Sequence, residues 1–166
     1  MNRTETLRYQ SAFRDFATID HWNAPHAVTL TMKQAVPVAN GQNALMAFID
    51  PAKASQNLGH FHAVLSRSIL GKPADRFGQR LSMIPVIEGG DGKRMHYHLL
   101  IDCPRDDLKS DFPRLVRETW LRTQWGYNQI DIQPDANDGF KFYFSKLRDK
   151  PNYADAIDWA NYHNPD

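Results

Sequence analysis

The segment MHYHLLID, residues 95–102, places His96 and His98 one residue apart in an apolar run. Alternate residues of a β-strand point to the same face of a sheet. If this segment is a strand, the two imidazoles project side by side, and Tyr97 points to the opposite face. Two imidazoles on one strand face can act together as ligands of a metal ion.

A third ligand is expected from the neighbouring strand. The apolar run MIPVIE ends at Glu88, and the following EGGDGK has the composition of a hairpin turn. Cross-strand pairing would bring residues near 88 beside residues near 96. Glu88, His96 and His98 would then offer one carboxylate and two neutral imidazoles, a set suited to a divalent metal used for catalysis. The alternative is that both histidines are solvated or packed polar residues of a sheet.

A second pair of the same spacing, His60 and His62, lies in GHFHAV. This segment has helical apolar spacing, and residues two apart on a helix diverge by about 200°. The two rings therefore cannot close on one ion, and we expect ordinary structural roles for them.

A phenol and an ammonium group lie three residues apart in FKFYFSKLRDK, at Tyr143 and Lys146. On a helix these residues are neighbours on one face. The lysine can lower the phenol pKa and can pair with a phosphate oxygen, and a deprotonated phenol is a competent nucleophile. The alternative is that Tyr143 is a core residue with its hydroxyl at the rim, because aromatic residues crowd this segment.

Apolar periodicity and turn residues predict the elements that must position these groups. Strands are expected at 26–33, 80–90, 94–104 and 128–134. Helices are expected at 4–17, 50–70, 105–124 and 138–150, with Pro113 near the start of the third. Loops are expected at 34–43 and 70–79, and the acidic tail is expected to lie over the surface. This order predicts an α+β fold: a ferredoxin-like (RRM-like) antiparallel sheet flanked by helices.

Taken together, three short motifs resemble those of the HUH endonucleases, in particular the rolling-circle replication initiator (Rep) proteins. VTLTMK (28–33) is similar to the first strand motif of that family. HYH (96–98) is similar to its histidine–hydrophobe–histidine signature, and YFSK (143–146) to the Y-x-x-K of its nucleophile helix. The resemblance covers about residues 26–150 and implies a single HUH endonuclease domain spanning residues 1–166.

The resemblance implies a metal-dependent endonuclease that nicks single-stranded DNA and transfers the strand. His96 and His98 would be metal ligands with Glu88 as the third, and the metal would be Mg²⁺ or Mn²⁺. Tyr143 would attack a DNA phosphate and form a 5′-phosphotyrosine link, and Lys146 would position the phosphate. Such an enzyme would initiate rolling-circle replication of an element such as a plasmid.

The remaining implications concern the DNA and other partners. Candidate contacts to the DNA backbone are Arg94, Lys141, Arg148 and Lys150. No G-x-x-x-x-G-K-[ST] helicase motif is present, so a host helicase or an already extruded DNA hairpin would supply the single strand. Two alternatives stay open: a single-tyrosine HUH transposase, and a non-catalytic nucleic-acid-binding module on a ferredoxin-like sheet.

Composition limits these functions only loosely. The net charge of +1 is low for a nucleic-acid-binding protein and favours other classes slightly. The 166 residues suit one domain, and the single Cys103 excludes an internal disulfide and a cysteine-built zinc site. No apolar stretch is long enough to cross a membrane, and the first residues lack the apolar core of a signal peptide. We therefore expect a cytoplasmic protein.

Overall fold

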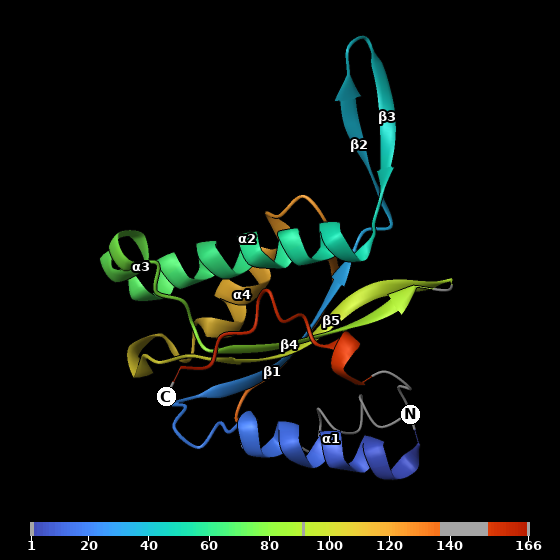
Figure 1. Ribbon diagram of the computed structural model, residues 1–166. Coiled ribbons are helices and arrows are strands. Elements are labelled where there is room, and N and C mark those ends of the chain that lie inside the picture. The colour runs from blue at the N-terminus through green and yellow to red at the C-terminus, as the bar shows by residue number, and fades with distance from the viewer. Residues whose placement is uncertain (1, 91, 137–152, 166) are drawn as a thin grey trace.

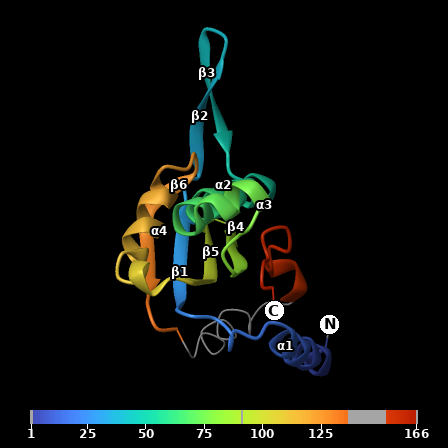
Figure 2. The same ribbon diagram turned by 90° about the vertical axis from the view of Figure 1, so that its left-hand side faces the viewer.

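The protein has an α+β fold built on one four-stranded antiparallel sheet, as predicted. The computed structural model describes residues 2–90, 92–136 and 153–165. In the order in which they lie side by side, the strands are β4 (Met83–Gly90), β5 (Lys93–Asp102), β1 (Pro25–Met32) and β6 (Gly126–Gln133); Figure 1 labels the first three and Figure 2 labels all four. The helices are α1 (Arg3–Phe16), α2 (Pro51–Leu70), α3 (Lys72–Phe77) and α4 (Phe112–Leu121), with short 3-10 turns η1 (Asp106–Leu108) and η2 (Tyr153–Ala156).

The strand order is that of a ferredoxin-like sheet. β1 and β4 both pair antiparallel with β5, so they run parallel to each other with β5 between them. β5 and β6 flank β1 in the same way. The two long connections, one through α2 and one through α4, therefore each skip a strand, which is the split β-α-β arrangement.

The larger core lies between the sheet and the helices α2 and α4, which cover the same face (Figure 1). α2 begins where the Asp50 side chain accepts a hydrogen bond from the Lys53 amide, with a proline in the first turn. Its apolar stripe of Leu58, Phe61, Leu65 and Ile69 is fully buried, as the sequence spacing predicted. The Phe61 ring meets the Trp120 ring of α4 edge to face, with centroids 5.5 Å apart.

A smaller core covers one end of the opposite face. There α1 and the C-terminal segment pack on the sheet, with Phe13 and Ile157 against Ile84 and Leu100. The other end of this face carries polar side chains from β4, β5 and β1, including the predicted metal ligands. The sheet thus has one wholly covered face and one face that is covered only in part.

The predicted loop at 34–43 is wrong. Residues Ala35–Asn40 and Asn43–Phe48 form the strands β2 and β3 of a separate two-stranded hairpin. Gly41, with a φ of 61°, lies in the two-residue turn between them. The glycine in this segment therefore indicates a hairpin turn and not a long loop.

Two further boundaries differ from the prediction. The expected loop at 70–79 contains α3, a helix of one and a half turns that has a proline in its first turn. The expected helix at 105–124 is a 3-10 turn followed by the shorter α4, with Pro113 in the first turn as predicted. The predicted helix at 138–150 lies outside the described residues.

The C-terminal segment was predicted to lie over the surface, and this prediction is only partly correct because several of its residues are buried or half-buried. It forms isolated bridges to β4, at Val86 with Ile157 and at Met83 with His163. The Asp158 carboxylate accepts hydrogen bonds from the hydroxyls of Tyr97 (2.8 Å) and Ser55 (3.0 Å). These bonds attach the segment to both β5 and α2.

Tyr97→Phe is expected to lower the free energy of unfolding by about 2 kcal/mol, because it removes a buried hydrogen bond to a carboxylate. Urea denaturation would measure this change. Tyr9→Phe is a matched control, since Tyr9 is 56% exposed on α1 and should change stability by less than about 0.5 kcal/mol. Equal effects of the two substitutions would contradict an anchoring role for Tyr97.

None of the helices among the described residues has the length and apolar character needed to cross a membrane.

Candidate metal centre

The β4–β5 hairpin brings the predicted ligands together. Glu88 pairs directly with His96, and His98 pairs with Val86 in the same register. The ladder shifts between Glu88 and Gly90, and Gly89 adopts a φ of 101°, which is accessible mainly to glycine. A Cβ at Gly89 would stand 2.6 Å from the Arg94 carbonyl oxygen, so the close approach of the strands beside the site requires glycine there.

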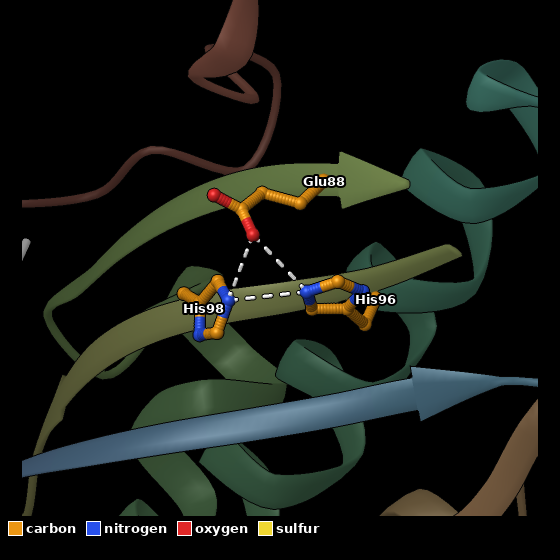
Figure 3. Close-up of side chains that lie close together, drawn as sticks. All are labelled: Glu88, His96 and His98. Carbon is orange, nitrogen blue, oxygen red and sulfur yellow. Dashed lines mark hydrogen bonds and ion pairs between the residues drawn. The ribbon is translucent and has the colours of Figure 1, made fainter. Parts of the chain in front are cut away.

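Three potential ligand atoms form a nearly equilateral triangle (Figure 3). The Nε2 atoms of His96 and His98 are 3.1 Å apart, and they lie 3.2 and 3.1 Å from Oε2 of Glu88. The side chains of His96, Glu88 and His98 are 24%, 19% and 7% exposed. The site is therefore half-buried and opens to solvent mainly beside His96.

Hydrogen bonds fix the orientation of both imidazoles. His96 Nδ1 lies 2.9 Å from the Arg94 carbonyl oxygen, which can only accept, so Nδ1 carries the hydrogen. His98 Nδ1 lies 3.1 Å from the Thr29 hydroxyl of the adjacent strand β1. Such contacts to the second ring nitrogen are usual for metal-binding histidines, because they hold the other nitrogen toward the ion.

The arrangement points a lone pair of His96 at the Glu88 carboxylate. With its hydrogen on Nδ1, the neutral His96 ring directs a lone pair of Nε2 at the Glu88 carboxylate, which also offers lone pairs. Either a proton or a metal ion relieves this contact. One carboxylate oxygen and two imidazole nitrogens are suitable ligands, so Glu88, His96 and His98 could hold a metal ion.

The other predicted site residues have different outcomes. Arg94 lies on β5 two residues before His96 and so belongs to the same sheet face by strand alternation. Its guanidinium lies 4.0 Å from the centroid of the Tyr127 ring and donates to the Met32 carbonyl. The other predicted residues, Tyr143, Lys146, Lys141, Arg148 and Lys150, lie outside the described residues.

Thr29 was not predicted as part of the site. It pairs directly with His98 in the β1–β5 ladder, although 69 residues separate the two in sequence. The only local signal was the alternation in VTLTMK, which places Thr29 and Thr31 on the same strand face. That alternation does not reveal which strand lies beside them.

Of the two histidines of α2, His62 has the structural role that was expected. His62 is buried, and its Nε2 donates to the Leu81 carbonyl oxygen at 2.7 Å, while His60 is exposed. Burial lowers the pKa of His62 to about 4, because the charged ring would lose its hydration. The two residues do not share a ligand position.

The buried His62 predicts a loss of stability in mild acid. The unfolded chain protonates this ring near pH 6.5, whereas the folded protein does so only near pH 4. The free energy of unfolding contributed by His62 is therefore complete above pH 6.5 and falls by up to about 3 kcal/mol as the pH drops to about 4. Urea denaturation across this window would measure the fall.

His62→Gln provides the control, since it keeps an N–H donor for the Leu81 carbonyl and does not titrate. Its stability should fall less across the same window. His26 and His163 also have pKa values lowered by burial. His26 is present in both proteins and cancels in the comparison, whereas the His163 ring lies 6.2 Å from the His62 ring and helps to lower its pKa, so the difference reports His62 together with this contact. Parallel curves for the two proteins would contradict the assignment.

Comparison with known proteins adds no relative: no family model, no curated protein and no solved structure matches this chain.

Proposed function

We propose that the protein is a metal-dependent endonuclease of the HUH type that nicks single-stranded DNA and transfers the strand. The observation that carries this proposal is the triangle of Glu88, His96 and His98, with its oriented imidazoles, on the partly open face of a ferredoxin-like sheet. The motif order in the sequence supports the assignment. Replication initiation of the rolling-circle type is the biological role that we infer.

The separations within the triangle are compatible with the octahedral geometry that Mg²⁺ and Mn²⁺ prefer. Ligands at about 90° around an ion, each about 2.1–2.2 Å from it, lie about 3.0–3.1 Å apart, whereas tetrahedral ligands lie about 3.4 Å apart. The observed separations of 3.1 and 3.2 Å are closer to the first value. We therefore propose Mg²⁺ or Mn²⁺, with positions left over for water and a phosphate oxygen.

The metal ion would act as a Lewis acid that polarises the scissile phosphate. The Tyr143 hydroxyl would lose its proton and attack phosphorus, forming an O–P bond as the bond between phosphorus and the 3′-oxygen breaks. The departing 3′-oxygen takes up a proton and becomes a free hydroxyl, while the 5′ end stays attached to Tyr143. Lys146 would pair with a phosphate oxygen and stabilise the phenolate. The reverse reaction rejoins a strand without loss of the bond energy.

Arg94 is the described cation best placed to bind the DNA backbone beside this site. It shares the sheet face of His96, and its ring contact with Tyr127 holds the guanidinium near β6. A cation stacked on an aromatic ring can contact phosphate with one edge while keeping that stacking. Lys141, Arg148 and Lys150 are proposed as further contacts.

A non-catalytic binding module is the second candidate, and the sheet face argues against it. Such modules present exposed aromatic residues on their central strands for stacking with bases. Here the central strands β5 and β1 offer His96, His98 and Thr29 on the partly open face. Tyr97 is turned to the other face and is fully buried.

The direct test is incubation of the protein with a pool of single-stranded oligonucleotides and Mn²⁺, followed by a denaturing gel. A covalent protein–DNA adduct that forms only with metal is the expected result. Binding of DNA without any adduct, under every metal tried, would favour the binding module. Transfer of the attached strand to a second oligonucleotide would show the reverse reaction, but it would not separate a replication initiator from a transposase.

A further inference from the structure

The β2–β3 hairpin is an apolar ribbon that projects from the body of the protein (Figure 1, Figure 2). Residues 34–49 contain no charged side chain. Three large apolar side chains of β3 are exposed: Leu45 by 50%, Met46 by 52% and Phe48 by 68%. A two-stranded ribbon is marginally stable by itself, and exposed strand edges usually carry charges that prevent pairing. This hairpin lacks that protection.

The outer edges of the two strands differ in their ability to pair. The Ile49 amide donates to the Gln34 carbonyl, so this pair is hydrogen-bonded across the hairpin. Paired residues alternate between hydrogen-bonded and non-hydrogen-bonded positions, and the ladder has no register shift. The Pro37–Met46 pair is therefore non-hydrogen-bonded, and its backbone polar groups point outward. Pro37 has no N–H, so the outer edge of β2 lacks a hydrogen-bond donor at this position. Another strand would therefore pair poorly with β2.

The outer edge of β3 is open. By the same alternation, the outward-pointing amides and carbonyls of β3 belong to Ala44, Met46 and Phe48. None of these residues is a proline, and no third strand pairs with β3 among the described residues. The edge therefore presents three successive hydrogen-bonding positions to an incoming strand.

We propose that β3 pairs antiparallel with β3 of a second copy of this chain, which joins the two hairpins into one four-stranded sheet. In the symmetric register centred on Met46, the Met46 residues of the two copies face each other. Phe48 then lies opposite Ala44 of the second copy, so a large side chain meets a small one. Outward-pointing backbone groups oppose outward-pointing groups throughout, as an antiparallel ladder requires.

The chemistry of the hairpin favours a second copy as the occupant. Because the hairpin carries no charge, two copies approach without like-charge repulsion, and neither side must desolvate an ionic group. A two-fold axis makes the same patch serve on both sides, which suits an edge that is complementary to itself. The hairpin also projects beyond the helices and the main sheet, so the two bodies can remain apart (Figure 2).

The pairing involves one short strand from each copy. It therefore buries less surface than a standard interface, which buries about 800 Å² per partner. We therefore expect a dimer that dissociates on dilution. Sedimentation velocity across the micromolar range should show a monomer–dimer equilibrium in the full chain.

Met46→Pro tests the pairing at its centre. It removes the outward N–H of β3 but leaves the inner β2–β3 hydrogen bonds, since the Pro37–Met46 pair does not contribute to them. In the proposed register the two Met46 residues exchange two hydrogen bonds, so the dissociation constant should rise by roughly thirtyfold. Ala39→Pro is the matched control: it removes an outward N–H from the blocked edge of β2 and should leave the equilibrium unchanged.

Three outcomes would overturn the proposal. One is a wild-type chain that stays monomeric at every concentration. Another is a dimer that Ala39→Pro disrupts and Met46→Pro does not. The third is a monomer that binds uncharged lipid vesicles through the hairpin, which would make a membrane surface the occupant. Met46→Ala separates backbone from side-chain effects, because it keeps the N–H and should weaken association less than Met46→Pro.

Discussion

Replacing both His96 and His98 with alanine is expected to abolish the rise in melting temperature that Mn²⁺ gives the wild-type protein. A ligand that binds only the folded state at a hundred times its dissociation constant stabilises that state by about 2.7 kcal/mol. For a chain of this size the corresponding rise is roughly 5–10 °C, and it should saturate with added metal. The double variant keeps only the Glu88 carboxylate, and a single carboxylate binds such ions weakly.

The comparison must be made within each variant, with and without metal. Loss of the imidazoles also removes their hydrogen bonds to Glu88 and Thr29, which changes the baseline stability. The matched control is a variant with alanine at His21 and His60, which removes two exposed imidazoles elsewhere and should keep the full Mn²⁺ effect. A metal effect that survives in the His96 and His98 variant and disappears in the control would place the metal elsewhere.

The candidate centre could be predicted because its geometry is set locally. Strand alternation fixed the common face of His96 and His98, and a single hairpin placed Glu88 beside them. The buried stripe of α2, from Leu58 to Ile69, could be predicted equally well, because its apolar residues recur with the helix period. Each of these predictions depends only on residues of one helix or of one hairpin.

The features that were missed depend on contacts between distant residues. Thr29 orients His98 only because β1 lies next to β5, and Asp158 reaches Tyr97 from the C-terminal segment. The hairpin at 35–48 was missed for another reason. Both of its faces are apolar, so it lacks the alternation that identifies a half-buried strand, and its proline and glycine were taken as loop signals.

Four of the six tyrosines can be compared as nucleophiles from the structure, and Tyr127 is the one that contacts a cation of the metal face, so it is the main alternative to Tyr143. Tyr97 points away from the metal face, and burial, together with the charge of Asp158, raises its pKa far above the usual range. Tyr9 is exposed on α1, and the Tyr162 ring stacks on Phe16. Tyr127 lies beneath the Arg94 guanidinium. Tyr153 belongs to the acidic tail, whose charge would repel a phosphate.

Tyr143→Phe is expected to eliminate the covalent DNA adduct while leaving Mn²⁺ binding unchanged, because Tyr143 is the tyrosine of the YFSK motif. The substitution removes only the hydroxyl, so stability should change by about 1 kcal/mol or less, whereas removal of a nucleophile costs on the order of 10⁴-fold or more in rate. Tyr127→Phe and Tyr97→Phe are matched controls that should still form the adduct, the second with lowered stability. Peptide mass spectrometry of the wild-type adduct would identify the attachment site directly. DNA linked to a peptide that contains Tyr127 or Tyr153, and not Tyr143, would overturn the assignment of the nucleophile. The metal centre would still be tested independently by the Mn²⁺ titration.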